Sequence, residues 1–281
     1  MIDIKEVVNL YTECFPEDSK EMIELFFRER LGIKNCHYIK IDNKLACQLF
    51  LVDKTLVYEK NNIYLPFIVG LGTAKEHRYK GLAKTLLIDV LEKLDGVPFI
   101  SLYPFSHEFY EKMSFATVSY DYNAEKTDTV ISAEKAYSIY KAYTKNLDFY
   151  IERTQKDFDL LDEITKLDGT YFCLISEGGY TNGEETVLLG SKGAAKGTMT
   201  RIVDLFAAIK LSKLSFPAIK ITDCLIKRNN VIISSDNGNV TFCENYEKEI
   251  DISVLTAAMF GLNFFYPYQI KNLNGHLLDR Y

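Results

Sequence analysis

Residues 78–83, with the sequence RYKGLA, have the residue types that bind a phosphate group at the start of a helix. Glycine and alanine leave room for backbone N–H groups to approach an anion. A helix that begins there adds its unpaired N–H groups and its partial positive charge. An ordinary turn between a strand and a helix can have the same sequence, so these residues alone leave both interpretations open. In the phosphate interpretation a pyrophosphate binds at Tyr79, Lys80, Gly81, Leu82, Ala83 and Lys84, with Arg78 adding charge.

The sequence on both sides predicts the strand and the helix that such a site needs. Residues 63–74 read as a strand that ends in the glycine-containing stretch GLGTA. Residues 82–94 place leucine and valine on one face at helical spacing, which predicts an amphipathic helix. A dinucleotide-binding fold fits less well, because Gly70 and Gly72 lie too early and no acidic residue follows on a second strand at the expected place.

The rest of the first 122 residues alternates between strands and helices. A helix over residues 17–31 has Asp18 or Ser19 as its cap, and residues 106–113 form a second, short helix. Strand-like runs with turn signals between them cover residues 37–41, 45–52, 55–59, 97–103 and 115–120. This order of elements predicts a mixed α/β layered fold.

The remainder of the chain divides at a glycine-rich stretch from Gly190 to Gly197, which reads as a loop and a domain boundary. Before it we expect helices over residues 132–145 and 156–167 and short strands over 170–176 and 185–190. After it we expect a helix over 200–211, strands over 218–227, 230–236 and 238–245, and a helix over 251–260. The last part therefore reads as a small α+β sheet domain.

Two of these segments resemble the Gcn5-related N-acetyltransferase (GNAT) superfamily. Its acetyl-CoA signature, [Q/R]-x-x-G-x-[G/A], is matched by Arg78, Gly81 and Ala83. The aromatic-rich run YPFSHEFYEKMSF, which ends at Phe115, resembles the F-Y-x-x-x-G-F ending of the family, with Ser114 in place of the glycine. The resemblance implies a GNAT fold with acetyl-CoA as co-substrate.

Further stretches are similar to the Eis (enhanced intracellular survival) type of acetyltransferase: YPFS at 103–106, AYSIYKAY at 136–143, and MTRIVDL at 199–205. The resemblance implies three parts. Residues 1–122 are a GNAT acetyl-CoA-binding domain, 123–190 a shortened second GNAT-like region, and 191–281 a sterol-carrier-protein-like α+β domain. The middle part is much shorter than in that family, which puts the acceptor contacts from that region in question.

Acetyl transfer from a thioester to an amine requires that the amine lose a proton, that a donor bind the oxyanion, and that the departing thiolate receive a proton. The resemblance implies that a backbone N–H on the strand Leu71-Gly72-Thr73 binds the oxyanion. It also implies that Tyr110 is the general acid toward the CoA sulfur, since a phenol is protonated at neutral pH. The alternative is that Tyr110 only packs a helix. Phe105 and Ser106 complete the expected cofactor contacts.

The same resemblance implies an unusual base, the C-terminal carboxylate, here that of Tyr281. The last residues, LLDRY, are partly apolar and end in an aromatic residue, as expected of an inserted tail. A solvated tail is the default for a terminus. His107 and Glu108 are rival bases, because both lie close to Tyr110 in the sequence.

The charge distribution bears on the acceptor. Residues 121–190 hold 7 Lys/Arg against 14 Asp/Glu, which is either ordinary solvated surface or a field that attracts a cation. We expect direct transfer, in a ternary complex, to a primary amine of an aminoglycoside-like, polyamine-like or lysine-containing molecule. The alternative function is a catalytically silent acyl-CoA- or lipid-binding module.

Several classes of function are disfavoured. The net charge of −6 gives no support for nucleic-acid binding. No apolar run has the ~18–20 residues of a membrane-spanning helix, and the first residues do not read as a secretory signal. The cysteines and histidines lack the spacing of a metal site, so we expect no metal and reduced thiols in a cytoplasmic protein. The resemblance implies a homo-oligomer, a hexamer in that family.

Overall fold

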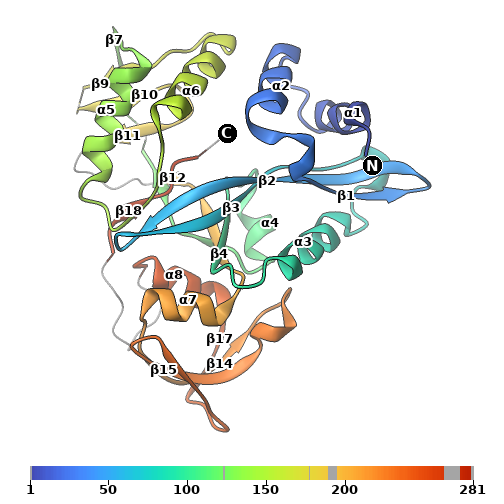
Figure 1. Ribbon diagram of the computed structural model, residues 1–281, viewed down its shortest axis with the longest axis vertical. Coiled ribbons are helices and arrows are strands. Elements are labelled where there is room, and N and C mark those ends of the chain that lie inside the picture. The colour runs from blue at the N-terminus through green and yellow to red at the C-terminus, as the bar shows by residue number, and fades with distance from the viewer. Residues whose placement is uncertain (1, 123, 177, 189–194, 263–272, 280–281) are drawn as a thin grey trace.

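The computed structural model describes residues 2–122, 124–176, 178–188, 195–262 and 273–279 (Figure 1). Its centre is an eight-stranded mixed sheet in the order β18-β8-β2-β3-β4-β13-β5, with β1 paired to β2. The long hairpin of β2 (Lys44–Tyr58) and β3 (Asn61–Thr73) forms its middle. The other strands are β1 (Cys36–Ile41), β4 (Phe99–Leu102), β5 (Ala116–Thr117), β8 (Phe149–Ile151), β13 (Met199–Ile202) and β18 (Gly275–His276).

Helices cover both faces of this sheet. Successive side chains of β2 point to opposite faces, and apolar residues occur on both, so each face needs a cover. Phe50 and Val52 pack under α1 (Ile4–Cys14) and α2 (Lys20–Phe26). Leu49 and Leu51 pack on the opposite side, against α3 (Leu82–Lys93). The short helix α4 (His107–Glu111) lies on the same side as α3 (Figure 1). The predicted mixed α/β layered fold is therefore confirmed.

The middle of the chain forms a small layer beside the sheet. Helices α5 (Ala133–Thr144) and α6 (Gln155–Leu167) pack on each other, and Ser132 and Thr154 cap them. A four-stranded antiparallel sheet lies next to them, in the order β11-β10-β9-β7. Its strands are β7 (Lys126–Val130), β9 (Cys173–Ile175), β10 (Gly179–Thr181) and β11 (Thr186–Leu188), and β6 (Tyr120–Asp121) pairs separately with β12 (Ala195–Lys196).

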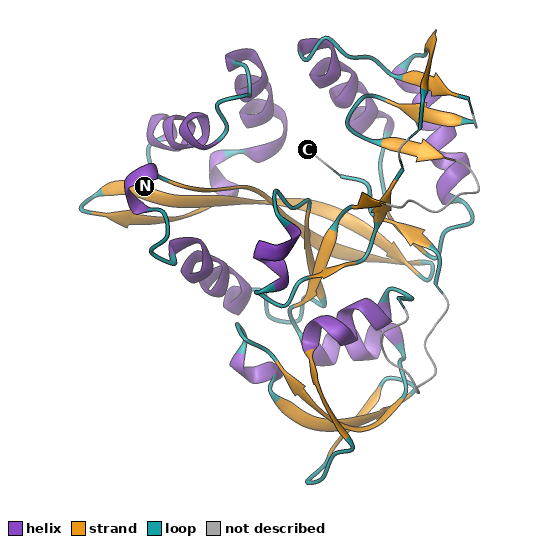
Figure 2. Ribbon diagram, turned by 180° about the vertical axis from the view of Figure 1, so that it is seen from behind, coloured by secondary structure: helices purple, strands orange, loops and turns teal. Residues whose placement is uncertain are grey.

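The last part of the chain contains a second four-stranded sheet in the order β16-β15-β14-β17. Two helices, α7 (Leu205–Ser212) and α8 (Ile252–Met259), lie between this sheet and the central one (Figure 2). The turn at Asn237 and Gly238 has positive φ at both residues, which an Asn-Gly hairpin turn requires. The strands are β14 (Phe216–Thr222), β15 (Val231–Asp236), β16 (Asn239–Phe242) and β17 (Lys248–Asp251).

The predicted helix over residues 200–211 is wrong at its beginning. Met199–Ile202 is β13, which pairs with β4 and β5 inside the central sheet. All four residues are fully buried, including the polar Thr200, whose Oγ1 lies 2.7 Å from Ser101 Oγ, and Arg201, which pairs with Asp223, so the strand shows no alternation of apolar and polar residues. The helix begins only after Asp204, whose side chain caps it by accepting from the Ala207 N–H at 2.9 Å.

Other boundaries also differ from the prediction. The separately expected strands 45–52 and 55–59 are one strand, β2. The expected helix 17–31 is divided into α2 and a π-helical turn over Phe27–Leu31, and the expected strand 218–227 ends at Thr222. In the described residues no helix is long and apolar enough to cross a membrane. The three-part division of the chain stays a prediction, although strands from all three parts join the central sheet.

Candidate active site

The central strands β3 and β4 separate at one end of the sheet. They run parallel but pair only between Phe67 and Ser101 and between Ile68 and Leu102. Beyond this point β4 ends, whereas β3 continues to Thr73. The register of β3 against β2 also shifts near Gly70, where φ is +61° and an added Cβ would lie 3.0 Å from the Tyr11 ring. The strand backbone that includes the predicted residues Leu71, Gly72 and Thr73 therefore extends past its parallel neighbour.

The predicted phosphate-binding loop follows directly. Arg78 is linked to the end of β3, because its Nε donates to the Thr73 carbonyl at 3.1 Å. Gly81 is the residue before α3, with φ of +78°, and an added Cβ would meet no heavy atom within 4 Å. Tyr79 is fully exposed. The first N–H groups of α3 thus lie beside open space, as an anion-binding helix start requires.

Tyr110 is buried in a cluster of aromatic rings on α4. Ser106 caps this helix, with its hydroxyl accepting from the Phe109 N–H at 3.3 Å. The Tyr110 ring lies 5.6 Å, centroid to centroid, from both Phe105 and Phe115. Burial raises the pKa of the phenol well above its usual range. The phenol therefore stays protonated at neutral pH and can act as a hydrogen-bond donor.

Tyr110 lines a cavity of about 450 Å³ in which several elements meet. One wall is β3, from Phe67 to Leu71, and another is formed by Tyr103 and Phe105 before α4. Of the predicted site residues, the cavity brings together Leu71, Phe105 and Tyr110. Four carboxylates also line it: Glu17, Asp18, Asp168 and Glu184.

These four carboxylates were not predicted as site residues. Glu17 and Asp18 precede α2, whereas Asp168 and Glu184 follow α6 and β10, so they meet only in the folded chain. Burial raises the pKa of Asp18. The one sequence signal for them was the acidic excess in residues 121–190, which contains Asp168 and Glu184. Together the four carboxylates give the cavity a negatively charged wall.

The rival bases do not line this cavity. His107 Nε2 lies 2.9 Å from the Gly197 carbonyl oxygen. Glu108 is exposed and pairs with Lys112 at 2.7 Å. Tyr281, the other predicted catalytic residue, lies outside the described residues. Within the part of the chain that the structure describes, no group of His, Cys, Asp and Glu side chains could hold a metal ion.

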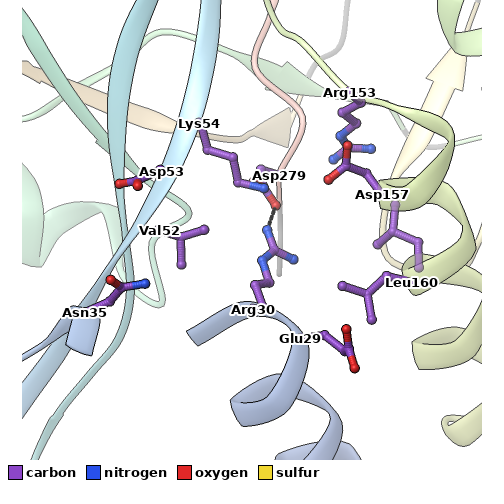
Figure 3. A pocket seen from close by; sticks show the side chains of 11 residues that line it. Glu29, Arg30, Asn35, Val52, Asp53, Lys54, Arg153, Asp157, Leu160 and Asp279 are labelled. Atoms are coloured by element: carbon purple, nitrogen blue, oxygen red, sulfur yellow. Dashed lines mark hydrogen bonds and ion pairs between the residues drawn. The ribbon is translucent and has the colours of Figure 1, made fainter. Parts of the chain in front are cut away.

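A second cavity, of about 300 Å³, contains the last described residue, Asp279 (Figure 3). Asp279 is buried and pairs with Arg30 from the N-terminal region and with Lys54 of β2, whose Nζ lies 2.5 Å away. Burial and the nearby Arg30 lower the pKa of Lys54 to about 8. Burial would raise the pKa of Asp279, but the two cations hold it well below its usual range. The C-terminal segment is therefore fixed in the interior as far as Asp279.

The comparison with protein families decides the identity of the N-terminal part. Residues 2–118 match the family described as acetyltransferase (GNAT) domain. This part of the chain is similar to a GNAT acetyltransferase domain. The diverging strands, the loop before α3 and Tyr110 all lie within it. No curated protein sequence matches the chain.

Solved structures share the fold over nearly the whole chain. Eis1 from Mycobacterium abscessus has 13% identity and a TM-score of 0.69, with 93% of this chain and 88% of that chain covered. A GCN5-related N-acetyltransferase from Anabaena variabilis has 17% identity and a TM-score of 0.66, covering 91% and 87%. A probable N-acyltransferase from Enterococcus faecalis has 14% identity and a TM-score of 0.65, covering 92% and 87%. At these identities the likeness concerns the fold alone.

Proposed function

We propose that the protein transfers an acetyl group from acetyl-CoA to a primary amine of a cationic acceptor, directly within a ternary complex. The observation that carries this proposal is the 450 Å³ cavity, in which the end of β3 meets Tyr110 and four carboxylates. It combines a place for a thioester, a proton donor and a negatively charged wall around one cavity.

Acetyl-CoA is the donor, and its three sections have separate contacts. The pyrophosphate binds the N–H groups at residues 79–84, where Gly81 leaves the space open. The pantetheine lies along Leu71, Gly72 and Thr73, beyond the last pair of β3 and β4. A backbone N–H on this stretch stabilises the oxyanion, and Phe105 and Ser106 lie at the start of α4 beside the thioester.

Tyr110 protonates the sulfur of the departing CoA. Its support is the raised pKa of the phenol and its position on the cavity wall. A phenol that stays protonated cannot be a base at neutral pH, so it serves the leaving group rather than the amine. The carboxylate of Tyr281 remains a proposed base that no described residue tests.

The acceptor carries more than one positive charge. Glu17, Asp168 and Glu184 are exposed, and Asp18 is half-buried, so the charges face an opening that an extended cation can enter. Charged walls raise the local concentration of an oppositely charged substrate. Polyamines, aminoglycosides and lysine side chains have this chemistry.

The C-terminal part is proposed to be a sterol-carrier-protein-like scaffold in a homo-oligomeric enzyme. Its support is a four-stranded sheet with α7 and α8 on one face and a fully buried core that includes Ile219, Ile221 and Leu255. A core filled in this way serves packing between domains.

The test is steady-state release of CoA thiol from acetyl-CoA with a panel of amines. We expect turnover with polyamines and aminoglycosides and little with uncharged amino-sugar derivatives. Asp168→Asn should raise KM for a polycation, whereas Asp159→Asn, at an exposed position on α6, the helix that Asp168 follows, should not. Binding of CoA without turnover on any amine would instead favour the silent binding module.

A further inference from the structure

A second tyrosine of the cavity has a buried carboxylate behind it. Tyr103 lines the same cavity as Tyr110. Its hydroxyl donates to Asp121 Oδ2 at 2.8 Å. Asp121 is only 5% exposed, so this carboxylate cannot exchange a proton freely with bulk water. The tyrosine is the group through which Asp121 can reach the cavity.

The fold holds the Asp121 carboxylate in one place. Asp121 lies in β6, where it pairs with Ala195 of β12. An added Cβ at Gly197 would lie 2.6 Å from Asp121 Oδ1, so only glycine leaves the carboxylate its position. The His276 Nε2 atom faces the same oxygen at 3.5 Å. Strands from distant parts of the sequence therefore converge on one acidic group.

His276 is itself fixed from its other side. Its Nδ1 lies 2.9 Å from the Tyr143 hydroxyl, and its ring is 3% exposed. The next residue, Leu277, is held by Ser119, which accepts from its N–H at 3.1 Å, and by Thr198, which donates to its carbonyl at 2.6 Å. If the Tyr143 hydroxyl donates to Nδ1, the imidazole presents its remaining N–H to Asp121.

We propose that Tyr103 and Asp121 form the path by which the acceptor amine loses its proton, with His276 positioning the carboxylate. This inference rests on the proposed acetyl transfer, and it assigns a base that the sequence analysis did not consider. Tyr103 is the catalytic residue of the pair, because it is the one of the two that lines the cavity. Asp121 acts through it.

The proton transfers balance as follows. An N–H bond of the acceptor ammonium breaks as a new O–H bond forms at Tyr103, and the original hydroxyl proton of Tyr103 passes to Asp121 Oδ2. The electron pair left on nitrogen attacks the thioester carbon. The proton on Asp121 returns through Tyr103 to water after the products leave, and it is the one proton that the reaction releases. As the C–S bond of the tetrahedral intermediate breaks, Tyr110 gives its proton to sulfur, and a second proton lost from nitrogen restores the Tyr110 hydroxyl.

Two variants test the path without removing bulk from the site: Tyr103→Phe and Asp121→Asn. With a polyamine acceptor each should lower kcat/KM by about 10²–10⁴, the range for loss of a general base. Affinity for CoA, measured by calorimetry, should stay unchanged. Tyr120→Phe is the matched control, because it removes a hydroxyl from the neighbouring residue of β6, which alternates to the other face.

The discriminating measurement repeats the assay with methoxyamine, a weakly basic amine that is largely unprotonated at neutral pH. A proton path should matter much less for this acceptor, so the two variants should recover most of their activity relative to wild type. Equal losses with both acceptors would mean that Tyr103 and Asp121 only maintain structure, and no loss with the polyamine would exclude the path. Wild-type protein that acetylates no amine at all would overturn the proposed function, and the path with it.

Discussion

At the scale of single residues, Tyr110 combines burial, a raised pKa and a place on the cavity wall. Replacing it by phenylalanine keeps the ring contacts with Phe105 and Phe115 and removes only the hydroxyl. We expect Tyr110→Phe to lower kcat by about 10²–10³ with CoA affinity nearly unchanged, because one general acid is lost. Steady-state kinetics and calorimetry measure the two effects. Tyr64→Phe, at an exposed tyrosine bonded to Asp53, is the control, and wild-type turnover in Tyr110→Phe would reduce Tyr110 to packing.

At the scale of elements, the start of α3 decides cofactor binding. Gly81 has φ of +78° and faces open space, so a larger side chain fits there apart from the cost of the left-handed backbone, about 1–2 kcal/mol. Gly81→Glu places a carboxylate against the pyrophosphate and should abolish CoA binding in calorimetry while the protein stays folded.

Two further variants separate charge from strain at this helix. Gly81→Gln has the same backbone cost without the negative charge and should bind CoA more tightly than Gly81→Glu. Gly96→Gln repeats the positive φ, here +72°, beyond the other end of α3 and should bind CoA as wild type does. Unchanged affinity in Gly81→Glu would refute the predicted phosphate site.

At the scale of the whole molecule, Asp279 joins the C-terminal segment to the GNAT domain through Arg30 and Lys54 (Figure 3). Asp279→Asn leaves both cations buried without their anion. We expect it to lower the free energy of unfolding by on the order of 3 kcal/mol, as measured in urea. Asp53→Asn, at an exposed neighbour lining the same cavity, should change it by less than about 0.5 kcal/mol. Equal losses of unfolding free energy in the two variants would show that the ion pairs of Asp279 do not stabilise the protein.

The same ion cluster predicts a pH dependence of stability. The pKa of Lys54 falls from its ordinary value of 10.5 to about 8 in the folded protein. Between these values the unfolded chain holds more protons than the folded one, so stability rises with pH in that window. Unfolding in urea from pH 8 to 10 should show wild type gaining stability relative to Lys54→Met. If the difference in unfolding free energy between the two proteins stays constant from pH 8 to 10, the lowered pKa of Lys54 is contradicted.

Elements that are encoded by patterns within a few residues could be predicted from the sequence alone. The apolar stripe of α3 and the caps at Ser19 and Ser132 predict helices that the structure contains. The signature at Arg78, Gly81 and Ala83 indicated the GNAT domain, because the turn before a helix is encoded within a few residues. Residues of this kind can be found without knowing their partners.

Contacts between residues that are distant in the sequence could be found only from the folded structure. The four acidic residues of the cavity come from opposite ends of the first 184 residues. His276, which lies near Asp121, belongs to β18, a strand of only two residues. β13 shows the same limit, since Met199–Ile202 joins the sheet only because β4 and β5 leave a place between them. Pairing of strands and side chains over such separations depends on how the whole chain packs. It cannot be predicted from the hydrophobic period or from the spacing of residues.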